Sequence, residues 1–215
     1  MTTITADDLK SLIALIAEAM TRERDRLCEL DGVIGDADHG IAMELGFSAA
    51  AKAIAELDPA TADPTLVFNT AAKAFLNAVG ASSGPLYATG LMRAGAAVKG
   101  KPSLSDDDMV GAFAAIAKGI QDRGKAEVGE KTMVDAWAPA AAACQATREK
   151  GMPLKDCFAQ ALTAAEAGMQ ATRDMVATKG RSSRLGERAV GHVDPGAASA
   201  TVVVACFHAY FSSDR

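Results

Sequence analysis

Three aspartates and a histidine lie close together between two glycine-containing ends of one short stretch, Asp-Gly-Val-Ile-Gly-Asp-Ala-Asp-His-Gly. The carboxylates are Asp31, Asp36 and Asp38, and the imidazole is His39. Side chains two residues apart on a helix point in different directions. Asp36 and Asp38 can therefore reach one ion only if the backbone is irregular there, and the glycines on either side of them allow that.

This set of side chains predicts a site for a divalent metal ion. Carboxylate oxygens without a cysteine ligand suit Mg²⁺, which completes its coordination with water and with the phosphates of a nucleotide. The alternative is a solvated turn in which Asp38 caps the following helix. The pair Asp36 and Asp38 alone does not separate the two interpretations, but the addition of Asp31 favours the metal site.

A second stretch has residues that could hold phosphate. Ser82 and Ser83 precede Gly84 and Pro85, where a helix is expected to begin. Free N–H groups and the positive end of the dipole at such a start attract anions. An ordinary capped helix start is the alternative. The chain has no Gly-x-x-x-x-Gly-Lys-Ser/Thr sequence, so phosphate binding of the P-loop kind is not expected.

Arg181 is the strongest basic candidate. Its planar guanidinium can hold phosphate oxygens and offset charge on a phosphoryl group in transfer. A surface salt bridge with Glu187 or Asp194 is the alternative. Asp194 followed by Pro195 is also typical of a helix start, and capping does not exclude a contact with a ligand.

Taken together, these motifs resemble one family, the nucleotide-binding L subunit of dihydroxyacetone kinase. The form that works with the bacterial phosphoenolpyruvate-dependent phosphotransferase system is the most similar. In that form a histidine follows the second aspartate of the Asp-x-Asp pair, as His39 follows Asp38 here. The ATP-dependent single-chain kinases tend to have Thr at that position. The matching stretches are 31–40, 80–86, 123–133, 180–188 and 191–196, in the family's order and over nearly the whole chain.

The resemblance implies two Mg²⁺ ions held by Asp31, Asp36 and Asp38, and a bound ADP or ATP. Met133 and Gly124 would line the adenine pocket, although core packing is the commoner role of a methionine. Arg181 would be the catalytic residue. Lys125 and Lys131 are interpreted as solvated and are left out of the site. The expected nucleotide-binding residues are His39, Gly40, Ser82, Ser83, Gly124, Met133, Arg181, Asp194, Pro195 and Gly196.

The function that the resemblance implies is a phosphoryl relay. A phosphohistidine on an M-type partner of the phosphotransferase system would rephosphorylate bound ADP, which would pass the group to dihydroxyacetone on a separate K subunit. Two alternatives stay open: an ATP-dependent kinase subunit for a related ketose such as erythrulose, and a non-catalytic nucleotide-binding module that docks on a transcription regulator. The chain departs from the family at two positions: Ala42 stands where the family usually has Asn, and Arg184 where it commonly has an aromatic residue. These departures leave open the identity of the sugar and of the phosphoryl donor.

Composition predicts an all-α fold, and the length of the chain fits a single domain over residues 1–215. The resemblance implies an antiparallel barrel or bundle of about eight helices with the nucleotide-metal site at one end. Hydrophobic residues make up 49% and aromatic residues only 5%, which favours closely packed helices over a sheet. Three consecutive valines make 201–206 a candidate strand, too short to change that prediction. The expected helices are 6–30, 40–56, 64–80, 83–100, one starting at 105, 132–150, 153–179 and 196–212.

Charge and cysteine usage narrow the setting. The net charge of −5 and the absence of a basic tract argue against a nucleic-acid partner. Cys28, Cys144, Cys157 and Cys206 are scattered singly, as expected of free thiols in a reducing compartment. No leader or membrane-spanning segment is evident. A cytoplasmic protein without a membrane partner is the prediction.

Overall fold

The computed structural model describes residues 3–80 and 83–213, and within them the eight expected helices form in the expected order. Two short 3₁₀ segments, η1 (Thr172–Asp174) and η2 (Ser182–Ala189), lie between the last two helices. The α-helices are α1 (Ala6–Ile34), α2 (His39–Ala55), α3 (Pro64–Val79), α4 (Gly84–Ala97), α5 (Asp106–Gly124), α6 (Val134–Glu149), α7 (Leu154–Ala171) and α8 (Pro195–Ser212).

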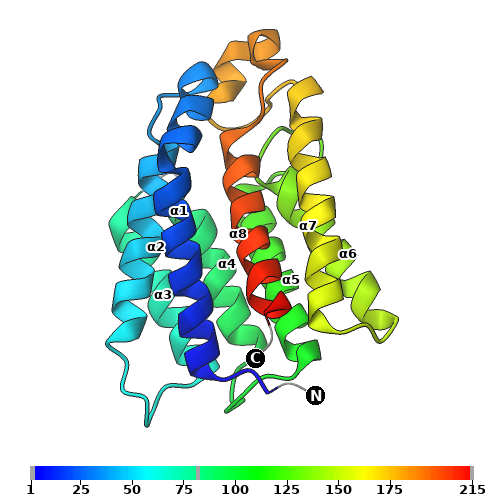
Figure 1. Cartoon of the computed structure of the whole chain (residues 1–215). Helices are drawn as coiled ribbons and strands as arrows, with labels where there is room; N and C mark the ends of the chain where they lie inside the picture. The colour runs from blue at the N-terminus through cyan, green and yellow to red at the C-terminus, as the bar shows by residue number, and fades with distance from the viewer. Residues whose placement is uncertain (1–2, 81–82, 214–215) are drawn as a thin grey trace.

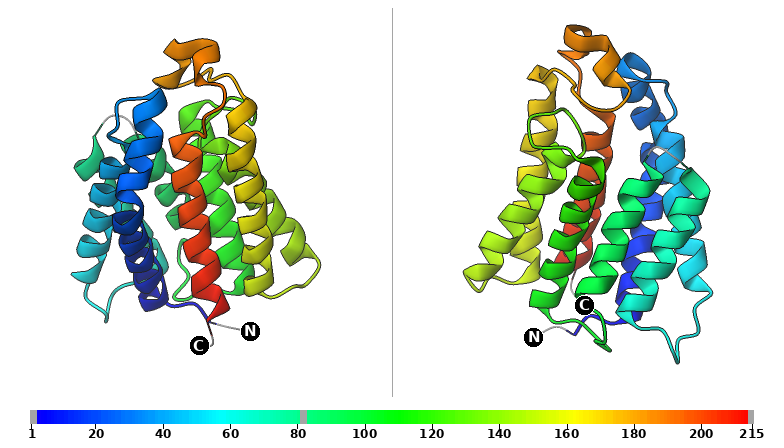
Figure 2. Two further views of the ribbon diagram at one scale, coloured as in Figure 1. Left: turned by 45° about the horizontal axis from the view of Figure 1, so that its top comes forward. Right: turned by 180° about the vertical axis from the view of Figure 1, so that it is seen from behind.

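The helices form a closed antiparallel barrel. Each helix packs against the next one in the chain, and α8 packs against both α7 and α1. Successive helices run in opposite directions, so the start of α1 and the end of α8 lie at the same end of the molecule (Figures 1 and 2). The all-α prediction is confirmed, because the helices bury their apolar faces against one another without any strand among the described residues.

The helix starts follow from capping signals in the sequence. Thr5 and Asp8 form a capping box at α1, in which each side chain accepts the other residue's backbone N–H. Ser105 and Asp108 do the same at α5. Asp63 caps α3, with a proline in the first turn. These bonds satisfy N–H groups that a helix cannot pair internally, so the boundaries are fixed locally.

Two predicted helix ends are wrong, and both errors lie near the motifs. The first helix continues past Leu30 to Ile34, which places Asp31 inside its last turn. The seventh helix ends at Ala171 instead of reaching Lys179. The segment after it departs from the barrel as 3₁₀ turns and loop, because it crosses the end of the barrel to reach α8 (Figure 1).

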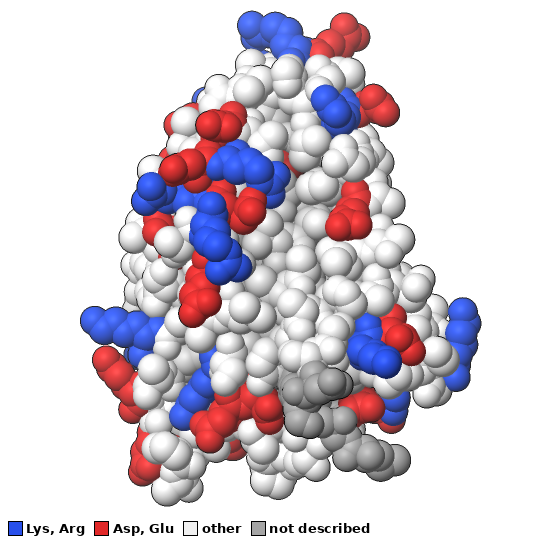
Figure 3. Space-filling view, in the orientation of Figure 1, with Lys and Arg blue, Asp and Glu red and all other residues white. Residues whose placement is uncertain are grey.

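The last helix is the most buried wall of the barrel. It carries no Lys, Arg, Asp or Glu. Its valine-rich stretch 201–206 is helical, so the candidate strand does not form. A helix that is apolar all round belongs in a core. Figure 3 shows mostly uncharged surface over α8, between charged groups on either side. No helix among residues 3–80 and 83–213 is both long and apolar enough to span a lipid bilayer.

All the aromatic residues except Phe68 form one chain of ring contacts through the barrel. Neighbouring ring centroids lie 5.0 to 6.4 Å apart, several of them edge to face. Such pairs add to the burial energy of the rings. Because the rings come from α2 to α8, this chain links opposite walls. Its members are Phe47, Phe75, Tyr87, Trp137, Phe113, Phe158, Phe207, Phe211 and Tyr210.

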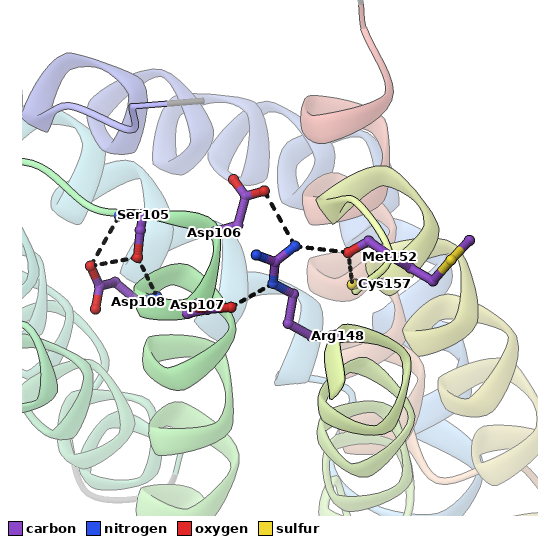
Figure 4. Close-up of polar contacts among 7 residues, drawn as sticks. All are labelled: Ser105, Asp106, Asp107, Asp108, Arg148, Met152 and Cys157. Carbon is purple, nitrogen blue, oxygen red and sulfur yellow. Dashed lines mark hydrogen bonds and ion pairs between the residues drawn. The ribbon is translucent and has the colours of Figure 1, made fainter. Parts of the chain in front are cut away.

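One arginine joins three segments at the opposite end of the barrel from the motifs (Figure 4). Arg148 donates from Nε to Asp107, pairs with Asp106 at 3.5 Å, and donates to the carbonyl of Met152 at 3.0 Å. The Cys157 thiol donates to that same carbonyl at 3.4 Å. The start of α5 is thereby tied to the turn between α6 and α7.

Helices α6 and α7 approach each other closely where Gly168 faces the carbonyl of Asp135. A Cβ at Gly168 would collide with that oxygen. Pro139 lies four residues after Asp135 inside α6 and has no N–H to donate, so the carbonyl lacks its usual partner within the helix. The glycine allows α7 to cover the exposed carbonyl.

We therefore expect Gly168→Ala to destabilise the protein. The new methyl group must push two packed helices apart, which costs about 1–3 kcal/mol of unfolding free energy. That corresponds to a drop of roughly 2–4 °C in melting temperature per kcal/mol for a chain of this size. Thermal unfolding followed by circular dichroism measures it.

The matched control is Gly111→Ala, because Gly111 lies inside α5 with open space where its Cβ would be. Alanine is the better helix former there, so the control should gain about 0.5–1 kcal/mol. If both variants melt at the same temperature, the close approach of α7 to α6 is not a constraint on the fold.

Candidate functional site

All the predicted motifs converge on one end of the barrel. In an antiparallel barrel every second connection lies at the same end, and the connections α1–α2, α3–α4, α5–α6 and α7–α8 meet at the top of Figure 1. Each of the four contains a predicted motif. The fold therefore gathers stretches that are far apart in the sequence.

A pocket of about 300 Å³ opens among these connections. Gly40 is the described candidate that does not line it: α2 approaches the carbonyl of Arg24 there, and a Cβ would collide with that oxygen. Ser82 lies outside the described residues. The candidates that line the pocket are Asp31, Asp36, Asp38, His39, Ser83, Gly124, Met133, Arg181, Asp194, Pro195 and Gly196.

Asp31 organises the acidic loop. It is buried in the last turn of α1, and its Oδ2 accepts hydrogen bonds from the backbone N–H groups of Asp38, at 3.0 Å, and His39, at 3.3 Å. Asp38 occupies the capping position of α2 but makes no capping bond with its side chain. Gly35 is required because a Cβ there would overlap the Asp31 carboxylate. Asp31, not Asp38, therefore caps α2.

The three carboxylates converge through an irregular backbone, as expected. On the C-terminal side of the aspartates, however, Gly40 is not where the irregularity lies. Ala37 adopts a left-handed conformation with φ of 62°, while Gly40 is helical. One oxygen from each of Asp31, Asp36 and Asp38 lies within 4.8 Å of the other two. That spacing allows these hard oxygen ligands to share a divalent cation.

The guanidinium of Arg181 lies on this acidic group. It contacts the carboxylate of Asp36 and donates to Asp38 Oδ2 at 3.3 Å. These partners replace Glu187 and Asp194, which the sequence offered as the salt-bridge alternative. Burial raises the pKa of Asp38, and the neighbouring Asp31 charge raises it further. The loop is thus a place where added positive charge is favourable.

His39 lies at the border between the acidic loop and the core. Its Nε2 lies 2.8 Å from the hydroxyl of Ser199, which itself donates to the carbonyl of Gly196 at 3.0 Å. The hydroxyl therefore accepts from Nε2–H, which leaves Nδ1 of His39 unprotonated. Burial lowers the pKa of His39 despite the nearby Asp31 charge, so the neutral ring is favoured.

Ser83 supplies an unpaired hydroxyl at the start of α4. The residue is 6% exposed, it lines the pocket, and its Oγ has no hydrogen-bond partner among the described residues. It makes no capping bond either. A buried polar atom left without a partner is unfavourable. Together with the positive end of the α4 dipole, the hydroxyl points to an anionic ligand.

The opposite wall of the pocket is apolar. Met133 is 7% exposed, packs with the barrel core and also lines the pocket, so its two suggested roles coexist. Gly124 lies beside it in the lining. A polarisable thioether and aliphatic side chains suit a flat, weakly polar ring. The aliphatic members of this wall are Leu86, Ile120, Ala126 and Val134.

Asp194 caps α8 as its sequence predicts, and it also lines the pocket. Its Oδ2 accepts from the N–H of Ala197 at 2.7 Å. Burial raises the pKa of Asp194 to about 7, although the Ala197 N–H and the charge of Lys131 oppose the rise. The capping role and a contact with a ligand are therefore compatible in geometry.

The interpretation of Lys131 as solvated is wrong. Its side chain is 1% exposed, and its Nζ donates to the carbonyls of Thr172 and His192. These partners lie 41 and 61 residues away in the chain, so no local spacing could have indicated them. Lys125, by contrast, is exposed as expected. Other lining residues that sequence reasoning omitted are Thr132, Lys179, Gly180 and Ser182.

The departures from the expected pattern have different places in the structure. Ala42 lines the pocket, so the missing amide falls within the site. Arg184 is exposed on η2 and is not part of the lining. The first departure can affect a bound ligand directly, while the second changes only the outer surface above the pocket.

Comparison with known proteins agrees with this picture. A PEP-dependent dihydroxyacetone kinase 2, ADP-binding subunit DhaL, of Listeria innocua is 40% identical over 183 residues, which cover 85% of this chain and 84% of the relative. The PEP-dependent dihydroxyacetone kinase ADP-binding subunit DhaL of Escherichia coli is 40% identical over 184 residues, 85% of this chain and 86% of the relative.

The fold also matches a solved structure. The dihydroxyacetone kinase from C. freundii, in complex with AMP-PNP and Mg²⁺, aligns with a TM-score of 0.74 at 21% identity. The match covers 97% of this chain but 35% of that one, so this chain corresponds to about a third of that kinase. The family model described as DAK2 domain matches residues 33–209, and this chain belongs to that family.

Proposed function

We propose that this chain is the nucleotide-binding subunit of a phosphoenolpyruvate-dependent dihydroxyacetone kinase. Its membership of the DAK2 domain family and its 40% identity to ADP-binding subunits support this proposal. The observation that carries it is the pocket itself, in which three converging carboxylates and an unpaired buried hydroxyl face an apolar wall. Those features fit the phosphates and the base of a magnesium-bound nucleotide.

The acidic loop fits Mg²⁺ by its donor set. Asp31 is held in place by two backbone N–H groups, while Asp36 and Asp38 are exposed and paired with Arg181. Magnesium bound there would offset the negative charge of the phosphates and of the phosphoryl group in transfer. Two ions are the proposed number.

The chain's own residues would act by positioning and electrostatics. Ser83 and the start of α4 would hold phosphate oxygens, and Met133 with its aliphatic neighbours would hold the base. Asp36 and Asp38 would hold the cation with the same carboxylates that contact Arg181, so the cation would compete with the guanidinium for them. The released guanidinium would then face the phosphoryl group and stabilise its charge.

The proposed reaction is a relay in which the nucleotide stays bound. ADP would accept a phosphoryl group from a phosphohistidine of an M-type partner and would pass it to dihydroxyacetone on a K subunit. Purified chain should therefore release ADP or ATP on acid denaturation. With both partners, dihydroxyacetone should be phosphorylated at the expense of phosphoenolpyruvate. Turnover that needs only free ATP would instead support the kinase subunit for another ketose.

The first prediction for the site concerns Asp36→Asn. This change keeps the shape of the side chain but removes one charge that faces the cation. Binding of magnesium-ADP should weaken by at least about tenfold, since even outer-shell partners of metal sites contribute about 10–100-fold. Isothermal titration calorimetry measures the dissociation constant, and circular dichroism checks that the helices remain.

Asp25→Asn is the matched control, because Asp25 is also exposed and paired with an arginine, Arg24, but lies outside the pocket. It should bind magnesium-ADP like the parent. Equal affinities for the parent and Asp36→Asn would mean that the acidic loop is structural.

The second prediction concerns Arg181→Ala. Arg181 is half-exposed, so the helical content should not change. Loss of one charge-assisted contact to a developing negative charge costs about 3–4 kcal/mol of barrier, or roughly 10²–10³ in turnover. The assay uses the K and M partners, dihydroxyacetone and phosphoenolpyruvate, and nucleotide binding should weaken much less than turnover.

Arg188→Ala provides the comparison, because Arg188 is exposed on η2, the segment that begins directly after Arg181, but is not part of the pocket lining. It should leave turnover within about threefold of the parent, a change below ~1 kcal/mol. If Arg181→Ala falls in that same range, Arg181 is only an ion-pair partner of the acidic loop.

A further inference from the structure

Lys131 is the one lysine that the structure buries completely among the described residues, and it lies in the pocket wall. A buried ammonium is unfavourable unless its hydrogens find acceptors and its charge finds opposite charge. Lys131 Nζ donates to two backbone carbonyls, those of Thr172 and His192. An ammonium has three donors, so these two carbonyls use most of its capacity.

The two carbonyls belong to different segments of the site. Thr172 lies directly after α7, at the negative end of the helix dipole, and its carbonyl also accepts from the N–H of Met175 at 3.3 Å. His192 lies two residues before Asp194, which caps α8. These segments are also joined to each other, since Asp194 N–H donates to the Thr172 hydroxyl at 2.9 Å and Gly191 N–H donates to the Arg173 carbonyl at 2.7 Å.

Lys131 adds the α5–α6 connection to this junction. The Asp135 carboxylate accepts from the N–H of Gly129 at 2.5 Å and of Thr132 at 2.7 Å, residues that lie on either side of Lys131 in the sequence. In the residue before Lys131, the carbonyl of Glu130 accepts from the N–H of Thr178 at 3.3 Å. The ammonium is therefore the buried charged contact that joins this loop, and with it the neighbouring Met133, to the end of α7 and the start of α8. A more exposed pair, Lys179 with Glu130 at 3.7 Å, joins the same loop to the segment after α7.

The charges around Lys131 are consistent with a retained ammonium. Burial lowers its pKa, while the carboxylates of Asp194, Asp135 and Asp174 act in the opposite direction. The backbone is also unusual at this residue. Lys131 has φ of 60°, a left-handed conformation that non-glycine residues rarely adopt. Such strain persists where the surroundings fix the residue, often at binding sites.

We propose that Lys131 is a positioning residue for the nucleotide, which sets the base-binding wall of the pocket by joining the α5–α6 loop to the end of α7 and the start of α8. The proposal rests on the proposed function, because it assumes a nucleotide in the pocket. It predicts that Lys131 affects the base end of the ligand far more than the phosphate end, since the acidic loop and Ser83 belong to other connections.

The experiment compares two ligands on one variant, Lys131→Met, which keeps the length and the apolar stem of the side chain but removes the ammonium. Calorimetry with magnesium-ADP should give a dissociation constant about tenfold higher than the parent's, equal to ~1.4 kcal/mol. Magnesium-pyrophosphate, which lacks the base, should bind within about twofold of the parent. A role confined to general stability would weaken both ligands alike.

The matched control is Lys125→Met. Lys125 lies in the same loop and has the same left-handed conformation, with φ of 50°, but it is exposed. This variant should bind both ligands like the parent. Unchanged binding of magnesium-ADP by Lys131→Met, or equal weakening of both ligands, would overturn the proposal.

Two further outcomes are decided by the parent chain. If Lys131→Met does not fold, amide hydrogen exchange of the nucleotide-free parent tests the proposal instead. The amides of residues 126–133 should exchange much more slowly than those of the exposed connection at 57–62. Similar rates in the two segments would overturn the proposal. If the parent binds magnesium-pyrophosphate but not magnesium-ADP, the proposed function fails and this inference with it. If the parent binds both and only the variant comparison fails, the proposed function stands without Lys131.

Discussion

The acidic end of the site depends on one carboxylate, that of Asp31, which both caps a helix and contributes to the candidate metal site. Asp31 accepts two N–H groups from the start of α2, and it presents its remaining oxygen capacity to the same space as Asp36 and Asp38. Without this cap, the start of α2 would lose the side-chain hydrogen bonds that join it to the last turn of α1. The same hydrogen bonds that end one helix and start the next therefore set the geometry of the candidate metal site.

Much of this arrangement could be predicted because the signals are local. Capping boxes at Thr5 and Ser105 and the Asp63 cap are complete within four residues, so the sequence alone locates those helix starts. Helices that alternate in direction bring every second connection together, and the motifs lie in those connections. The predicted grouping of distant motifs thus requires only the helix order and short loops.

The errors have a different physical origin, since each depends on contacts between segments far apart in the chain. Lys131 resembles a solvated lysine of a polar loop, and only the carbonyls of Thr172 and His192 make it a buried one. The sequence after Ala171 continues a helical pattern, but the chain must leave the barrel to cross its open end. Neither outcome follows from composition or spacing, because tertiary contacts override local preference.

The distribution of charge explains why metal and nucleotide should bind together. The acidic loop and the phosphates of a nucleotide are both negative, so a nucleotide without a cation would be repelled from this end of the pocket. Arg181 offsets part of the loop's charge, and Lys131 interacts with the charges of Asp194, Asp135 and Asp174. Neither cation is free to neutralise three carboxylates and a diphosphate at once. A divalent ion held by the loop would offset that repulsion, and the affinity for each ligand would then depend on the other.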